Sequence, residues 1–268
     1  MKNGMVQNDK NMPYPRVCAH RGFNTIAPEN TMPAFAAAIA LGAEEIEFDL
    51  WATKDGELVT AHDSKLERVS NGEGYIGNYT LAALKELDFG SHFSEKLRGL
   101  KLPTFEEILE QFAGRVIMNI HVKIWDALDD PKNDVDPRYE QIAALIRKYD
   151  CEEHIYFMTT HTECLLEMRK ILPKASYCQG SQSGSSGGNG RMVELAIEHG
   201  FDKVQFVFWR PFDKEMIDKA HANGIKCNYC QADEGEDAIK HLEMGIDTIM
   251  TNDFHLVRES IKNYLPKK

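Results

Sequence analysis

Short apolar runs alternate with longer stretches of mixed polarity along this chain. Nine runs rich in Val, Ile and Phe have the length and composition of β-strands. They lie near residues 17–20, 45–51, 57–62, 116–123, 154–158, 175–178, 203–208, 226–231 and 248–251. Most are separated by stretches with the apolar spacing of amphipathic helices, such as 139–149, 163–172, 191–199, 212–223 and 236–244. This alternation predicts a parallel sheet with crossover helices.

The second and third runs are an exception, because only Thr53-Lys54-Asp55-Gly56 joins them. Asp-Gly is a strong hairpin signal, so the run at 57–62 is expected to pair antiparallel with its predecessor. The eight remaining strands are the number that closes a TIM (β/α)8 barrel. We therefore expect residues 1–268 to form one α/β domain of this type.

About forty residues lie between His62 and Leu102, which is too long for an ordinary connection. They contain turn signals at 71–74 and 77–78 and one short helical pattern at 81–87. We expect a small excursion near the C-terminal mouth of the barrel, where loops build the active site.

Composition narrows the classes of function. The chain has 268 residues, of which 31 are Lys or Arg and 42 are Asp or Glu, giving a net charge of −11 without a basic block. A nucleic-acid partner is therefore not expected, and a phosphorylated ligand would need local cations or a metal to hold it. The sequence has no leader-like or membrane-spanning apolar stretch, and its six cysteines are scattered along the chain. We therefore expect a soluble, cytoplasmic protein with reduced thiols.

Glu47 and Asp49 are two apart on a predicted strand, so both side chains project from one face. Two carboxylates on the inner face of a barrel repel each other unless a cation lies between them. Oxygen ligands suit Mg²⁺, Ca²⁺ or Mn²⁺. The alternative is an exposed strand end with two solvated acids.

Histidines end two of the predicted strands. The first strand ends in His20-Arg21-Gly22 and the hairpin ends in His62-Asp63, both plausible rim positions. A His and an Arg side by side offer a proton-transfer group and a bidentate phosphate clamp. The alternative is a histidine satisfied in the core beside a surface arginine.

On the strand at 116–123, Asn119, His121 and Lys123 share one face. Polar residues that face into a barrel near its C-terminal end are costly unless they bind something. This position favours His121 as a metal ligand and Lys123 as a phosphate contact.

Taken together, these residues resemble the glycerophosphodiester phosphodiesterase family. The segments that carry the resemblance are Ala19–Gly22, Ala27–Thr31, Gly42–Asp49, Thr53–Gly56, Val59–Asp63, Leu66, Arg68, Asn71–Gly72 and Leu102–Glu107. The likeness is good over 17–123 and weaker beyond. It implies a TIM barrel with an inserted subdomain, here about 63–101. It also implies hydrolysis of a small-molecule glycerophosphodiester to glycerol 3-phosphate and an alcohol, with one divalent metal ion.

The resemblance also implies roles for individual residues. His20 and His62 would be the acid/base pair, and Arg21 and Lys123 would contact the phosphate. Glu47 and Asp49 would be metal ligands.

Three positions depart from the family pattern. His121 stands where the family usually has a third metal-binding Glu, Cys230 where it often has Trp, and Asn252 where it usually has Asp. A nitrogen ligand in place of an oxygen shifts metal preference from Ca²⁺ toward Mn²⁺, Fe²⁺ or Zn²⁺. Loss of the Trp removes an aromatic wall, which would change the preferred leaving alcohol.

Other functions stay open at this point. The barrel could bind a phosphodiester with weak or no catalysis, or carry a related phospholipase D-type activity. Gly184–Gly188 matches a serine-hydrolase pattern, but it lies in the stretch 180–190, where nine of eleven residues are Gly or Ser, which makes a chance match expected. Cys227 and Cys230 are three apart on a predicted strand and face opposite sides, so a redox or zinc pair is not favoured.

Overall fold

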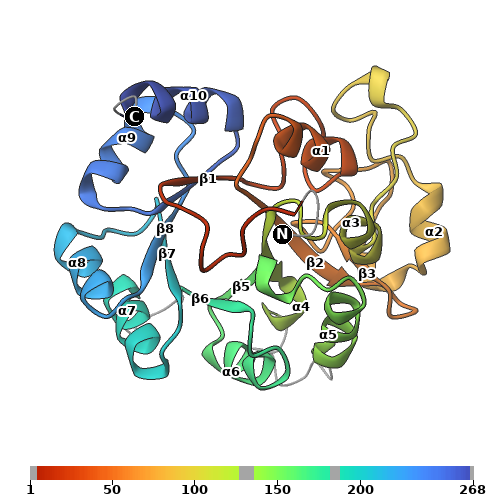
Figure 1. Cartoon of the computed structure of the whole chain (residues 1–268). Coiled ribbons are helices and arrows are strands. Elements are labelled where there is room, and N and C mark those ends of the chain that lie inside the picture. The colour runs from red at the N-terminus through yellow and green to blue at the C-terminus, as the bar shows by residue number, and fades with distance from the viewer. Residues whose placement is uncertain (1–4, 127–135, 182–187, 266–268) are drawn as a thin grey trace.

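Eight parallel strands close into a barrel in the computed structural model, which describes residues 5–126, 136–181 and 188–265. The strands are β1 (Arg16–Ala19), β2 (Glu45–Ala52), β4 (Ile117–Val122), β5 (Ile155–Thr159), β6 (Ser176–Gly180), β7 (Lys203–Val207), β8 (Lys226–Cys230) and β9 (Thr248–Thr251). β1 pairs with β9 on one side and with β2 on the other, which closes the ring. The TIM barrel expected from the sequence is thus confirmed (Figure 1).

The ninth strand is the expected hairpin partner. β3 (Leu58–Thr60) runs antiparallel to β2, with Leu50 opposite Thr60 and Ala52 opposite Leu58. It lies outside the ring of parallel strands, and His62 is the second residue after its end.

Helices surround the barrel, as Figure 1 shows. They are α1 (Met32–Ala40), α3 (Phe105–Phe112), α5 (Tyr139–Lys148), α6 (Thr162–Ile171), α7 (Gly188–His199), α8 (Lys214–Ala222), α9 (Gly235–Met244) and α10 (Phe254–Tyr264). α3 shows how the sequence sets the start and the buried side of a helix. Thr104 and Glu107 form a reciprocal capping box at its start, and Ile108 and Leu109 face the core. Among the helices that the structure describes, none has the length and apolarity that a bilayer crossing needs.

Residues 63–101 carry short elements and an apolar cluster separate from the main core. The elements are η1 (Ile76–Asn78), α2 (Leu81–Glu86) and η2 (Glu95–Leu97). The cluster consists of Val59, Ala61, Leu66, Val69, Ile76, Leu84, Phe89 and Leu102. Its members come from β3 and the residue after it, from the segment itself and from Leu102, three residues before α3, so the segment packs on the hairpin. Its interpretation as an inserted subdomain stays a prediction.

Buried charges fill the end of the barrel where the strands begin. Arg16, at the start of β1, is fully buried and donates to Asp9 Oδ1 at 2.6 Å and to Glu45 Oε1 at 2.9 Å. Lys203, at the start of β7, donates to the same Asp9 oxygen at 2.9 Å and to Tyr14 Oη at 2.9 Å. The N-terminal segment, red in Figure 1, therefore covers this end of the barrel through paired charges.

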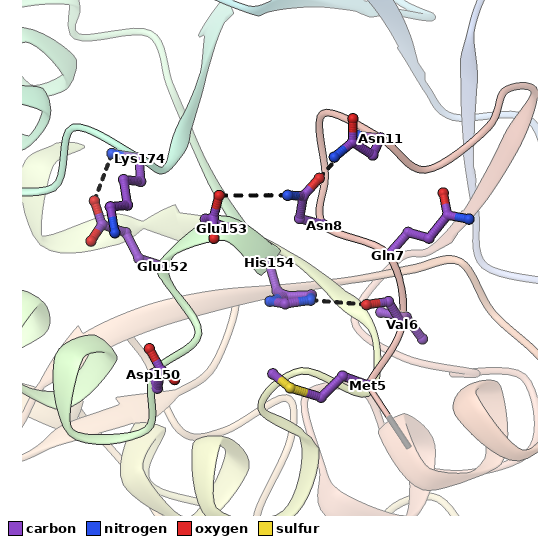
Figure 2. A pocket seen from close by; sticks show the side chains of 10 residues that line it. All are labelled: Met5, Val6, Gln7, Asn8, Asn11, Asp150, Glu152, Glu153, His154 and Lys174. Atoms are coloured by element: carbon purple, nitrogen blue, oxygen red, sulfur yellow. Dashed lines mark hydrogen bonds between the residues drawn. The ribbon is translucent and has the colours of Figure 1, made fainter. Parts of the chain in front are cut away.

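A hollow of about 560 Å³ lies beside that segment (Figure 2). It is lined by residues 5–8 and 11 and by the region around η4 (Glu152–His154), whose His154 Nε2 donates to the Val6 carbonyl at 3.1 Å. None of the sequence-predicted site residues lines it. The carboxyl ends of the strands, at the other end of the barrel, hold the functional candidates.

All six cysteines lie in the described part of the chain, where they are buried and form no disulfide. Cys227 belongs to the main apolar core, whereas Cys230 packs with Cys18, Val207 and Met250 in a separate cluster. The two sulfurs of β8 thus lie on opposite sides of the strand. The serine-hydrolase pattern at 184–188 falls largely outside the described residues.

Candidate active site

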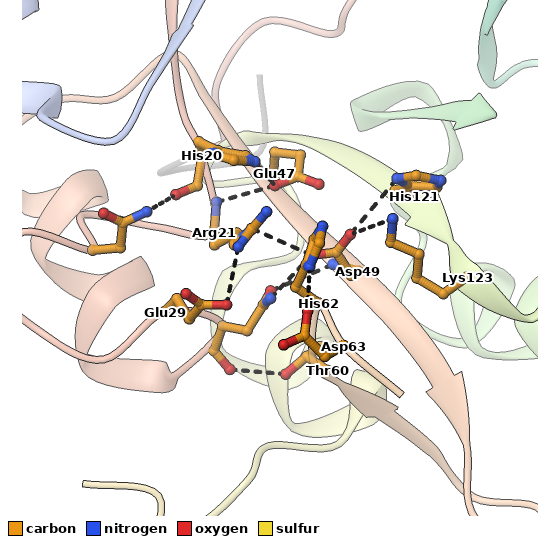
Figure 3. A network of polar contacts seen from close by, with 12 residues as sticks. His20, Arg21, Glu29, Glu47, Asp49, Thr60, His62, Asp63, His121 and Lys123 are labelled. Atoms are coloured by element: carbon orange, nitrogen blue, oxygen red, sulfur yellow. Dashed lines mark hydrogen bonds and ion pairs between the residues drawn. The ribbon is translucent and has the colours of Figure 1, made fainter. Parts of the chain in front are cut away.

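One cavity of about 530 Å³ opens at the carboxyl ends of the strands. The seven residues that the sequence singled out all line it: His20, Arg21, Glu47, Asp49, His62, His121 and Lys123. They come from the turn that follows β1, from β2, from the second residue after β3, from β4 and from the start of α4 (Lys123–Asp126). Figure 3 shows their side chains converging.

Glu47 and Asp49 are the most deeply buried of this group, with 2% and 1% of their surface exposed. Strand register explains their neighbours, because β2 pairs with β4 so that Asp49 lies opposite His121 and Glu47 opposite Asn119. The His121 Nδ1 atom is 3.6 Å from Asp49 Oδ1. Each of Glu47, Asp49 and His121 offers one ligand atom within 4.8 Å of the other two, a spacing that could hold a metal ion.

Both ring nitrogens of His121 make only long contacts in the part of the chain that the structure describes. Nε2 lies 3.5 Å from Asp126 Oδ2, and Nδ1 has the 3.6 Å contact with Asp49. These distances are at or beyond the limit of a hydrogen bond. A partly buried imidazole with no short hydrogen bond, beside two buried carboxylates, is a donor set that fits a divalent cation.

The two carboxyl groups differ in their electrostatics. Burial, and then the charge of Asp49, raise the pKa of Glu47 to about 8. Burial would also raise the pKa of Asp49, but the positive charge of Lys123, followed by His121 and His62, outweighs it and lowers that pKa. Without a cation the pair therefore shares a single negative charge near neutral pH.

Arg21 is placed by an unusual turn after β1. Its φ of 56° lies in the left-handed region, and its backbone N–H donates to Glu47 Oε2 at 3.0 Å. Gly22 follows with φ of +81°, and a Cβ there would lie 2.7 Å from the Ala34 carbonyl carbon. The turn brings the Arg21 guanidinium into contact with Glu29 at 3.1 Å and places its Nε 3.8 Å from Asp49 Oδ2.

His20 is oriented by an amide. Its Nδ1 lies 2.8 Å from Asn252 Oδ1, and the Asn252 amide nitrogen donates to Asp233 Oδ2 at 2.8 Å. Because that second bond fixes which end of the amide faces His20, Nδ1 is the donor and Nε2 keeps its lone pair. Nε2 lies 3.9 Å from Glu47 Oε2. Burial, and then the charge of Arg21, lower the pKa of His20 to about 4.

His62 is oriented by a carboxylate instead. Its Nδ1 lies 2.7 Å from Asp63 Oδ1, and Arg68 Nε donates to the other Asp63 oxygen at 2.6 Å. Its side chain is 36% exposed, so it stands nearer the solvent than His20. Burial, and then the charge of Arg21, lower its pKa, against the opposing effect of Asp49.

Lys123 is the first residue of α4, because β4 ends at Val122, one residue earlier than the sequence pattern indicates. Its ammonium lies 3.6 Å from Asp49 Oδ1 and 3.7 Å from Asp126 Oδ2. His121 and Lys123 thus reach the same carboxylates although they belong to different elements.

Several supporting residues were given no role from the sequence. Asn30 donates to Asp49 Oδ2 at 3.1 Å, and Glu29 accepts from both Arg21 and Arg68. The signal for them was present, because Glu29, Asn30 and Arg68 lie in segments that carry the family resemblance. Asp233 had no such signal, since its role depends on the fold bringing it to Asn252.

One strip of the far wall of the cavity is apolar, although Thr160, Ser181, Gln205 and Gln231 also line the cavity. The apolar strip is formed by Met158 of β5, Val207 of β7, Cys230 of β8 and Met250 of β9, all buried. The loop after β7 adds Phe208 and Trp209 at the rim, 58% and 61% exposed. The cavity therefore places ionisable groups opposite a partly apolar surface.

This arrangement agrees with a comparison against known protein families. The model of the glycerophosphoryl diester phosphodiesterase family matches residues 20–256. The chain belongs to this family. Membership identifies it as a phosphodiesterase that acts on a small-molecule diester.

Curated relatives cover nearly the whole chain. A glycerophosphodiester phosphodiesterase from Caldanaerobacter subterraneus is 31% identical over 245 residues, covering 88% of this chain and 93% of the relative. Another from Bacillus subtilis is 27% identical over 261 residues, covering 92% and 86%. The similarity therefore extends over the full barrel.

Solved structures share the fold. A phosphodiesterase from Oleispira antarctica, in complex with the product sn-glycerol-3-phosphate, superimposes with a TM-score of 0.75 at 23% identity. The likeness covers 93% of this chain and 97% of that one. At this identity it supports the barrel architecture, which the strand pairing shows independently.

Proposed function

We propose that this enzyme hydrolyses a glycerophosphodiester to glycerol 3-phosphate and an alcohol, with one divalent cation held by Glu47, Asp49 and His121. The observation that carries the proposal is the buried carboxylate pair beside His121, in the same cavity as two histidines and two cationic side chains. Membership of the family supports the reaction, as does the product bound to the Oleispira relative.

The donor set fits a cation of intermediate hardness. Two carboxylate oxygens and an imidazole nitrogen suit Mn²⁺, Fe²⁺ or Zn²⁺ as well as Mg²⁺, and are less typical of Ca²⁺. When bound, a divalent cation supplies Lewis-acid polarisation of a phosphate oxygen. We assign no metal identity beyond this order.

Arg21 and Lys123 are the proposed phosphate contacts. Arg21 has a planar guanidinium suited to two phosphate oxygens, and Lys123 supplies a point charge. Both already face Asp49, at 3.8 Å and 3.6 Å. The net charge of −11 repels an anionic substrate at long range. The cationic groups of Arg21 and Lys123 attract the phosphate locally and so offset this repulsion.

His20 and His62 are the proposed acid/base pair, and their partners suggest how the roles divide. With a pKa of about 4, His20 is neutral at pH 7, so its Nε2 lone pair is available to accept a proton. A carboxylate on Nδ1 does stabilise an imidazolium, so His62 is suited to donate a proton to the leaving oxygen.

The metal assignment is tested by production of glycerol 3-phosphate from glycerophosphocholine by chelator-treated enzyme, alone and with Mg²⁺, Mn²⁺, Zn²⁺ or Ca²⁺. We expect product only after a divalent cation is added. Elemental analysis should show that Glu47→Ala fails to retain metal, whereas Glu57→Gln, at an exposed position on the β2–β3 hairpin, retains it.

Full activity in chelator, or unchanged metal content in Glu47→Ala, would contradict the assignment. Tight substrate binding without any glycerol 3-phosphate, under all four metals, would instead favour a binding barrel that lacks catalysis.

A further inference from the structure

The catalytic cavity and a neighbouring hollow differ in chemistry. The hollow, of about 480 Å³, shares His20, Arg21 and Gln231 with the cavity. Its other lining residues are mostly polar or charged: Asn24, Glu29, Arg68, His92, Phe93 and Asn252. Groups bound near His20 and Arg21 therefore have a polar space on one side and the apolar wall of the cavity on the other.

An apolar strip of the wall extends from the barrel interior to the rim, beside the polar side chains of Ser181 and Gln205. Val207, Cys230 and Met250 pack together in one cluster, and Phe208 follows Val207 directly in the chain. The rings of Phe208 and Trp209 are 4.8 Å apart between centroids and nearly perpendicular, at 89°. This edge-to-face pair leaves both rings more than half exposed at the cavity mouth.

Exposed aromatic rings next to a catalytic cavity indicate that an apolar group of the substrate covers them when it binds. A glycerol group, with two hydroxyls, finds hydrogen-bond partners in the polar hollow and none on the side chains of Met158, Val207 or Met250. Met158, Val207 and Met250 carry no charge that would pair with a cationic alcohol such as choline. The rings of Phe208 and Trp209 can contact either a hydrocarbon chain or a quaternary ammonium group, which the experiment below separates.

We propose that the alcohol released by this enzyme carries a hydrocarbon chain, which lies along Val207 and Met250 and leaves the cavity between Phe208 and Trp209. The inference rests on the proposed function, because the reacting phosphorus must lie near His20 and His62. In that reaction a water molecule gives a proton to His20 as its oxygen forms a P–O bond, the P–O bond to the alcohol breaks, and the leaving alkoxide receives a proton from His62.

The inference predicts a dependence on chain length. Full burial of one methylene group corresponds to about a fourfold gain in kcat/KM. Methyl, butyl and octyl esters of glycerol 3-phosphate test this directly, since all three yield glycerol 3-phosphate. We expect kcat/KM to rise by at least about a hundredfold from the methyl to the octyl ester.

Two variants locate the effect at the rim. Phe208→Ala and Trp209→Ala should each lower the octyl-to-methyl ratio of kcat/KM by about tenfold, because a truncated ring buries less of the chain. Leu256→Ala is the matched control: Leu256 is 45% exposed, lies on α10 and does not line the cavity, so the ratio should stay at the wild-type value.

A comparison of kcat/KM for glycerophosphocholine and for the octyl ester distinguishes preference for a cationic alcohol from preference for a hydrocarbon chain. A flat series across the three alkyl esters, or a higher kcat/KM for glycerophosphocholine than for the octyl ester, would overturn the inference while leaving the proposed function in place. Absence of glycerol 3-phosphate from every ester would overturn both.

Discussion

His20 and His62 each have one ring nitrogen fixed by a different kind of partner. Asn252 presents a neutral oxygen to His20, and Asp63 presents a charged one to His62. In both rings the unfixed nitrogen is Nε2, so the two histidines have the tautomer that leaves Nε2 free to exchange a proton. The site thus contains two similar groups with different proton affinities.

Removal of either imidazole tests this assignment. We expect His20→Ala and His62→Ala each to lower kcat by at least about a hundredfold, because general acid/base catalysis contributes about 10² to 10⁴. The melting temperature, followed by circular dichroism, should change little. If both variants turn over at near wild-type rates, the two histidines have no catalytic role.

The raised pKa of Glu47 makes cation binding depend on pH. With a pKa of about 8, the carboxyl is mostly protonated at pH 7 in the metal-free protein and must lose that proton to become a ligand. Asp49, whose pKa is lowered, is already ionised. The apparent affinity for Mn²⁺ should therefore rise about tenfold between pH 7 and pH 9, with most of the rise below pH 8.

Isothermal titration calorimetry in buffers of different ionisation enthalpy measures this release directly. About one proton should be released per cation at pH 7 and almost none at pH 9. An affinity that does not change over this range would remove Glu47 from the ligand set.

The spacing of residues in the sequence was sufficient to predict the central residues of the site, but not the residues that hydrogen-bond to them. Glu47 and Asp49, and likewise Asn119 and His121, share a face because side chains alternate along a strand. The contact between Asn252 and Asp233 has no such rule, since it depends on how the chain after β8 meets the chain after β9. Local periodicity does not encode such contacts.

Among the elements, the strands were the easiest to predict. Each apolar run became a strand because it supplies residues for the packed barrel, and each amphipathic stretch became a helix with its apolar side inward. α1 was not predicted, because its sequence MPAFAAAIA is rich in Ala and has no polar face that would reveal a helical period. The apolar pattern also did not predict that β4 ends at Val122, one residue before the predicted end.

The turn between β1 and α1 depends on one glycine. Gly22→Ala should lower the free energy of unfolding by about 2–4 kcal/mol, because it combines a left-handed φ with a contact of 2.7 Å to the Ala34 backbone. Gly99→Ala is the control: its φ is +83°, but no atom lies within 4 Å of the added Cβ.

Urea denaturation measures both losses, and the control should lose only about 1 kcal/mol. Equal losses in the two variants would mean that backbone conformation alone, and not the close packing of α1 on this turn, requires glycine at position 22.

At the scale of the whole molecule, the barrel has two differently built ends. The carboxyl ends of the strands form the open cavity with partly unsatisfied polar groups, whereas the other end is closed by Asp9, Arg16 and Lys203 with short hydrogen bonds. The sequence predicted the barrel from the number of strands. It did not predict the closure, because residues 5–14 have no apolar periodicity and their partners are distant in sequence.

Asp9→Asn should destabilise the protein by about 3–5 kcal/mol, because it leaves buried positive charges with fewer partners. Burial would raise the pKa of Asp9, but Lys203 and then Arg16 outweigh it and lower that pKa. The stabilisation is therefore present above about pH 4, the unfolded value, and is lost as the pH falls further toward the folded pKa.

Chemical denaturation at pH 7 and at a series of lower pH values measures the difference between the wild type and this variant. Asp218→Asn, which breaks an exposed pair with Lys214, should cost less than about 1 kcal/mol at every pH. If the Asp9 and Asp218 variants are equally stable, the buried charges do not hold the N-terminal segment in place.

The bond between Asp9 and Lys203 spans 194 residues, which affects the order of events during synthesis. At the usual speed of translation, Asp9 leaves the ribosome about 10–40 s before Lys203. During that interval the first residues of the nascent chain have no docking place, and Arg16 has only part of its final surroundings. Late in folding, after most of the polypeptide has been made, the N-terminal segment must therefore close the end of the barrel where the strands begin.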